Sequence, residues 1–74
     1  MYKYRMGRDG VVVKEDRLPA ERVLHRVARS AHYASCGLDY KTTVDFTYDG
    51  RIIILIRFTT AEGNAIEHRY EKEA

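Results

Sequence analysis

The stretch Arg51-Ile52-Ile53-Ile54-Leu55-Ile56-Arg57-Phe58 decides the fold of this chain. Its β-branched and aromatic side chains are typical of a β-strand. Successive side chains of a strand point to opposite faces, so four apolar side chains share one face and two share the other. The larger set is Ile52, Ile54, Ile56 and Phe58, and the smaller set is Ile53 and Leu55. The strand is therefore apolar on both of its faces.

A chain of 74 residues is expected to form one domain with one modest core. One helix in such a chain can cover only one face of a sheet. Ile53 and Leu55 then need another cover, which a second copy, a partner or a folded-back terminus would supply. This incomplete burial predicts a binding role.

Composition and local patterns indicate a folded protein of the cytoplasm. The chain is 45% hydrophobic and 32% charged, which is ordinary for a globular domain. Its longest apolar run, Ile52 to Ile56, is far shorter than the ~20 residues of a membrane helix. The stretch from Met1 to Gly10 holds no apolar segment of a secretory signal. The lone Cys36 cannot form an internal disulfide, which favours a reducing, cytosolic setting.

Two short strands are expected before the helix. Tyr2 to Met6 alternates apolar and charged residues, Gly7 to Gly10 is expected to turn, and Val11 to Lys14 is β-branched. A meander of three strands is expected after the helix, at about residues 41–48, 51–60 and 65–71. The predicted fold is α+β, with strands and helix in the order ββαβββ and one amphipathic helix on one face of an antiparallel sheet.

The helix is expected at about residues 18–36, with Asp16 as its N-cap and Pro19 in its first turn. Gly37 would end it, followed by Leu38 as the apolar contact of the cap. At 100° per residue one stripe of this helix is apolar and would face the sheet. That stripe is Ala20, Val23, Leu24, Val27, Ala31 and Ala34. The opposite side is expected to carry Arg22, Arg26, Arg29 and Tyr33.

The Asp49-Gly50 pair predicts a hairpin with two alternative registers. A two-residue turn would pair Tyr48 with Arg51. A three-residue turn, with Gly50 in a left-handed conformation, pairs Tyr48 with Ile52 and shifts every pair by one. We prefer the second register because it gathers the apolar side chains of both strands on one face. Those side chains are Val44, Phe46, Tyr48, Ile52, Ile54, Ile56 and Phe58. Ile66 and Tyr70 of the last strand are expected on the same face.

Charge is unevenly distributed along the chain, although the net charge is only +2. Residues 1–36 hold eight lysines and arginines against four acidic residues, and residues 37–74 hold five against seven. The basic half is expected to attract an anionic partner. Three groups of residues are candidates for binding this partner. The expected helix carries Arg22, Arg26, Arg29 and Tyr33, the first hairpin carries Arg5 and Arg8, and the outer face of the sheet carries Ile53, Leu55 and Arg57.

Residues that carry chemistry are few. His32 and Cys36 are four apart, which suits two metal ligands, but a structural zinc site needs four. The same pair resembles a thiol and its base, yet the helix C-terminus raises a thiol pKa. No phosphate-binding loop or HExxH motif is present. We therefore expect no enzyme activity, no metal and no cofactor.

The first functional hypothesis is a small non-catalytic interaction protein. It would bind and block an acidic surface on a nucleic-acid-handling protein or a nucleoprotein complex. Phage-encoded inhibitors such as anti-CRISPR proteins share this general character, which is an analogy of class and not a sequence match.

Two alternatives stay open. One is a homo-oligomeric structural or regulatory module, such as a homodimer, with nucleic acid as a direct partner. The other is a small enzyme or ligand carrier that uses His25, His32, Cys36 or His68. No membrane association is expected.

Overall fold

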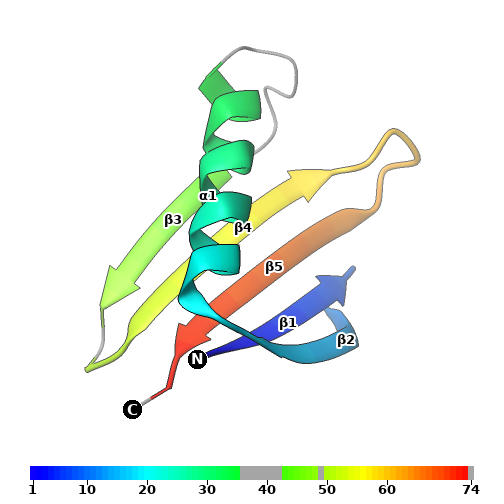
Figure 1. Cartoon of the computed structure of the whole chain (residues 1–74). Coiled ribbons are helices and arrows are strands. Elements are labelled where there is room, and N and C mark those ends of the chain that lie inside the picture. Colours follow the sequence, from blue (N-terminus) through cyan, green and yellow to red (C-terminus); the bar gives the residue numbers. More distant parts are fainter. Residues whose placement is uncertain (36–42, 49, 74) are drawn as a thin grey trace.

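A computed structural model describes residues 1–35, 43–48 and 50–73, without the side chains of residues 33–35. It confirms the predicted α+β fold in ββαβββ order, with one helix on one face of a five-stranded antiparallel sheet (Figure 1). The elements are β1 Tyr2–Arg8, β2 Val11–Leu18, α1 Ala20–Ser35, β3 Thr43–Tyr48, β4 Ile52–Thr59 and β5 Ala65–Lys72.

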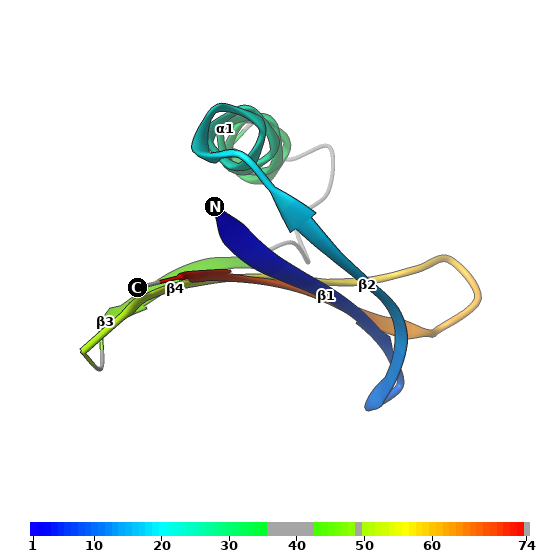
Figure 2. The same cartoon turned by 60° about the horizontal axis from the view of Figure 1, so that its bottom comes forward.

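The strands lie in the order β2-β1-β5-β4-β3. The predicted meander β3-β4-β5 is confirmed, and the first hairpin joins it because β1 pairs with β5. The two chain ends meet there, since the amide of Glu73 donates to the carbonyl of Met1 at 3.1 Å. The hairpin thus widens the sheet and does not fold over its outer face (Figure 2).

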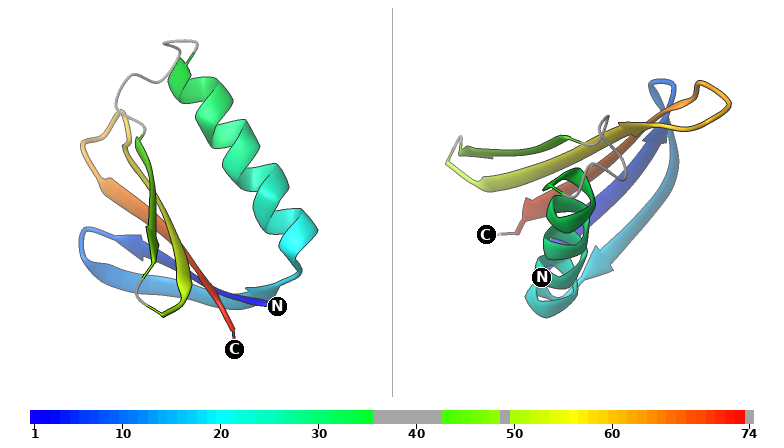
Figure 3. Two further views of the ribbon diagram at one scale, coloured as in Figure 1. Left: turned by 90° about the vertical axis from the view of Figure 1, so that its left-hand side faces the viewer. Right: turned by 90° about the horizontal axis from the view of Figure 1, so that it is seen from above.

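The core lies between α1 and the face of the sheet beneath it, which we call the helix face (Figure 3). Its buried cluster combines side chains of β1, β2, α1, β4 and β5. The members are Tyr4, Leu18, Val23, Val27, Ile54, Ile56 and Tyr70. Ile66 is also buried. Ile66 and Tyr70 therefore occupy the face predicted for them.

The preferred hairpin register is confirmed. Tyr48 pairs with Ile52 and Val44 with Ile56, and Gly50 has a left-handed φ of 70°. The helix does not cover the whole of this face, however. At the end of the β3–β4 hairpin, away from α1 in Figure 1, Phe46 is 65% exposed and Tyr48 is 78% exposed.

The predicted turn from Gly7 to Gly10 was too long. Only Asp9 and Gly10 turn, with φ of 51° and 84°, and two consecutive left-handed residues match the twist of a tight hairpin. Gly7 lies inside β1, opposite Val12, beside a bulge in β2. β1 is consequently longer than predicted, and β2 is longer because it continues beyond Lys14 to Leu18.

The predicted N-cap was wrong. Asp16 belongs to β2 and pairs with Tyr4, because β2 continues to Leu18. The helix begins at Ala20, and the carbonyl of Pro19 accepts hydrogen bonds from the amides of Arg22 and Val23. The expected helix end at Cys36, with the cap residues Gly37 and Leu38, lies outside the described residues.

The predicted apolar stripe of the helix was partly wrong. Val23 and Val27 are buried as expected, but Leu24 is 65% exposed, and Ala20 and Ala31 are exposed as well. Arg26, predicted on the outer side, is half-buried and faces the sheet. The helix is therefore rotated about its axis from the expected orientation, so that Arg26 and not Leu24 faces the sheet.

Two tyrosines beneath the helix account for this rotation. The guanidinium of Arg26 lies 5.1 Å from the ring centre of Tyr4. Hydrogen bonds to the side chains of Tyr70 and Tyr4 help to raise the pKa of Arg26. Tyr70 is only 2% exposed, so its hydroxyl needs a partner inside the protein. Arg26 thus joins the helix to β1 and β5.

His68 completes this cluster on the helix face. Its Nδ1 lies 2.6 Å from the hydroxyl of Tyr4, and its ring stacks on Tyr4 with 5.7 Å between ring centres. Burial, and next the positive charge of Arg26, lower the pKa of His68. Burial, followed by the nearby Tyr70, raises the pKa of Tyr4. The hydrogen bond therefore joins two groups whose neutral forms are favoured by burial.

Replacing Arg26 by leucine should destabilise the protein. The Arg26→Leu change leaves the buried Tyr70 hydroxyl without its partner and removes the cation–π contact, a combined loss of about 2–3 kcal/mol. Arg22→Leu is the matched control, because Arg22 is exposed one turn earlier on the same helix. Urea unfolding measures both. Equal losses for the two variants would show that Arg26 does not hold the helix.

His68 should make stability depend on pH in the window below its unfolded-state pKa of about 6.5. The folded state resists the proton that the unfolded state accepts, so the free energy of unfolding falls as the pH drops below about 6.5. His68→Gln should flatten this dependence, whereas His25→Gln, at an exposed position, should leave it intact. Thermal unfolding at several pH values measures the slope. An unchanged slope in His68→Gln would contradict this account.

Candidate functional site

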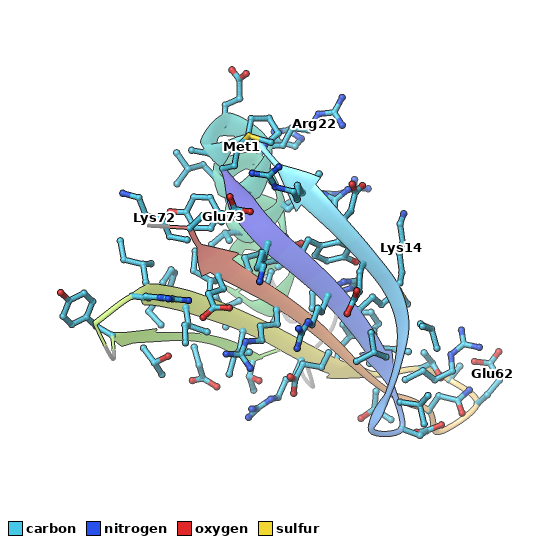
Figure 4. The ribbon with its side chains drawn as sticks, turned by 90° about the horizontal axis from the view of Figure 1, so that it is seen from below. Met1, Lys14, Arg22, Glu62, Lys72 and Glu73 are labelled. Carbon is cyan, nitrogen blue, oxygen red and sulfur yellow. The ribbon has the colours of Figure 1, made fainter. Side chains whose placement is uncertain are left out.

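The face of the sheet away from α1, here called the outer face, has no covering element among the described residues (Figure 4). The strand registers place alternate side chains of every strand on it. From β1, β4 and β5 these are Lys3, Arg5 and Gly7; Ile53, Leu55 and Arg57; and Glu67, Arg69 and Glu71. β3 adds Thr43, Asp45 and Thr47, as the register predicted.

Ile53 and Leu55 are half-buried at the centre of this face. Their shielding comes from long charged neighbours and not from another layer. Ile53 lies opposite Glu71, which pairs with Arg51 at 3.6 Å, and Leu55 lies opposite Arg69. The hydrocarbon stems of such residues cover apolar surface while their charged ends stay in water. The two apolar side chains thus remain accessible to a partner that displaces those stems.

Ion pairs give the outer face a mixed charge. Nε of Arg57 donates to Glu67 at 2.9 Å, and Arg5 pairs with Glu15 at 3.3 Å. At the edge near the chain ends, Arg17 donates two hydrogen bonds to the carboxylate of Glu73, at 2.8 and 2.6 Å. This contact lowers the pKa of Glu73. Exposed pairs of this kind add little stability, so they can rearrange when a partner binds.

One pair of residues on this face is electrostatically unfavourable. Arg5 and Arg69 are direct cross-strand partners on β1 and β5. Like charges directly opposite each other destabilise a sheet. Arg5 has Glu15 on its other side, whereas Arg69 has Leu55 there and no ion pair with any described residue. An anion between the two guanidinium groups would relieve this repulsion.

A hollow of about 340 Å³ adjoins the arginine pair. It lies over Gly7 and is also lined by Arg5, Arg57, Glu67 and Arg69. The backbone does not require glycine at position 7, because its φ lies outside the left-handed region. An added Cβ would meet its nearest neighbour, the carbonyl of Val11, at an ordinary 3.7 Å. The missing side chain therefore leaves open a space that most residues would fill.

The arginines predicted along the helix do not form one basic surface. Arg22 is exposed and projects from the helix (Figure 4), and Arg29 is exposed as well. Arg26 is used by the tyrosines beneath the helix. Tyr33 lies in the last turn of α1, but its side chain is outside the description. Arg8 is exposed at the end of β1.

The described residues with catalytic or metal-binding chemistry do not gather at one place. His25 and His32 are exposed on the helix, His68 is engaged with Tyr4, and Cys36 lies outside the described residues. Within residues 1–35, 43–48 and 50–73 no three histidine, cysteine or acidic side chains gather as metal ligands. None of the described helices has the length and hydrophobicity to cross a bilayer.

Sequence reasoning identified Arg5 and Arg57 but missed Arg69 and Gly7. Arg69 was missed because its position opposite Arg5 depends on the pairing of β1 with β5, which joins distant segments. Gly7 was read as part of a turn. The Asp9-Gly10 pair was the available signal, since a two-residue turn there extends β1 past Gly7.

Comparison of the chain with protein-family models, with curated protein sequences and with solved structures found no match.

Proposed function

We propose that the protein is a non-catalytic binding protein of the cytoplasm that blocks an acidic surface on a nucleic-acid-handling protein or a nucleoprotein complex. The outer face of the sheet is the docking surface. The single observation that carries the proposal is the opposed pair Arg5 and Arg69 beside the hollow over Gly7. Nucleic-acid handling by the target rests on the analogy with phage-encoded inhibitors alone.

A carboxylate of the partner fits the arginine pair. Guanidinium groups bind carboxylates through two parallel hydrogen bonds, and such charge-assisted bonds are stronger than neutral ones. The hollow accepts the side chain that carries this carboxylate. Binding would remove the like-charge repulsion between β1 and β5, so the free protein carries an unfavourable interaction that the complex relieves.

The rest of the outer face favours a protein over a nucleic acid. A phosphate backbone would meet the carboxylates of Glu67, Glu71 and Asp45, which repel it. A protein surface can complement both signs of charge and can also bury Ile53 and Leu55. Mixed charge around an apolar centre is common in protein interfaces.

A non-catalytic role agrees with the chemistry of the described residues. His68, the histidine whose pKa is shifted, has Tyr4 as its hydrogen-bond partner and packs on the helix face. The hollow over Gly7 holds arginines and one glutamate, and that glutamate is paired with Arg57. A lone cysteine fits a reducing compartment.

The docking surface can be mapped with a hexaglutamate peptide at low ionic strength. Peptide titration should shift the backbone NMR resonances of Arg5, Gly7 and Arg69. Arg69→Gln should weaken binding about tenfold, the cost of about 1.4 kcal/mol expected for a charge-assisted contact. Arg22→Gln, an exposed arginine of the helix, is the matched control and should change the affinity less than twofold. Equal effects of the two variants would contradict the site.

Gly7→Val tests the hollow without removing a charge. Valine suits a strand, so the variant should fold at least as stably as the parent protein, while its side chain excludes the peptide from the hollow. Thr47→Val is the control, because it places the same side chain on the outer face beside Ile53.

Tighter binding to a short DNA duplex than to hexaglutamate would overturn the choice of a protein partner.

A further inference from the structure

The outer edge of β3 is a second unsatisfied surface. β3 is the last strand of the sheet, and no described residue pairs with its free side. Its side chains on the helix face are Val44, Phe46 and Tyr48, of which Phe46 is 65% and Tyr48 is 78% exposed. Free backbone groups beside exposed aromatic side chains form a template on which another strand can pair.

The two edges of the sheet differ in how they are protected. β2, at the other edge, contains a bulge near its start and carries Lys14, and both features hinder edge pairing. β3 has the sequence Thr-Val-Asp-Phe-Thr-Tyr, with no lysine, no proline and an unbroken register with β4. An edge without these features is suited to a partner strand.

We propose that β3 pairs antiparallel with β3 of a second copy, about a two-fold axis that passes through Phe46. The partner is a second copy because the strand is complementary to itself in this register. Phe46 lies opposite Phe46 of the other copy, and Val44 lies opposite Tyr48. Aromatic and β-branched cross-strand pairs of this kind stabilise sheets. The two sheets join into one, with both helices on the same side.

Charge disfavours the neighbouring register whose axis passes through Asp45. Asp45 is the one charged residue of β3, and its carboxylate lies on the outer face. An axis through Phe46 places Asp45 opposite Thr47 of the second copy. An axis through Asp45 would oppose two carboxylates, which destabilises the pair. An axis between two neighbouring residues would place side chains from the helix face of one copy opposite side chains from the outer face of the other.

The dimer and the docking surface are independent of each other. β4 and β5 separate β3 from β1, so pairing at the β3 edge leaves Arg5, Arg69 and the hollow over Gly7 free. The dimer would present two such sites on one continuous sheet. A target with two acidic surfaces would then bind more tightly through multivalency.

Sedimentation velocity over a hundredfold range of concentration tests the dimer. The parent protein should shift from monomer to dimer as its concentration rises. Phe46→Lys places two like charges at the axis and should remove the dimer. Leu24→Lys is the matched control, because Leu24 is equally exposed but lies on the helix. A parent protein that is monomeric throughout, or a Leu24→Lys variant that loses the dimer to the same extent, would overturn the proposal.

Two substitutions of Thr47 test the register. Thr47→Lys creates two ion pairs with Asp45 across the axis and should tighten the dimer roughly two- to tenfold. Thr47→Asp creates two like-charge pairs and should weaken it to a similar extent. Exposed outer-face positions tolerate both changes. The same response to lysine and to aspartate would overturn the axis through Phe46.

Discussion

A single helix can cover only one face of a five-stranded sheet, and the rest of this structure depends on that constraint. The helix face holds the whole buried cluster. On the outer face, the hydrocarbon stems of charged side chains partly cover Ile53 and Leu55. The first hairpin is a segment that could have acted as a second layer. It joins the sheet through β1 and β5 instead, and thereby adds further exposed strand surface.

On the helix face, a polar contact joins the helix to the sheet. Arg26 provides a partner for the buried Tyr70 hydroxyl, which a purely apolar helix would leave unpaired, and this contact agrees with the rotation of the helix. The rotation exposes Leu24, and the hairpin end beyond the helix exposes Phe46 and Tyr48. The same constraint therefore leaves apolar surface at the centre of the outer face and along the β3 edge.

Much of the fold follows from local patterns. Alternation in β4 and the Asp49-Gly50 turn together predict the β3–β4 register, because only one register builds a continuous apolar face. The pairing of β1 with β5 does not follow from such patterns, since it joins segments more than fifty residues apart. For that reason, sequence patterns do not predict that Arg5 and Arg69 lie opposite each other. Sequence patterns also do not predict that Arg26 faces the sheet, because Tyr4 and Tyr70 lie side by side only after β1 pairs with β5.

Solvent accessibility of the four methyl-bearing residues in the middle of β4 is the most direct measurement of the central claim. A soluble paramagnetic agent broadens NMR signals of methyl groups that it can approach. In the free protein it should broaden Ile53 and Leu55 and spare Ile54 and Ile56, which are buried beneath the helix. Equal protection of all four residues in a monomeric sample would show that the outer face is already sealed, and would contradict the account.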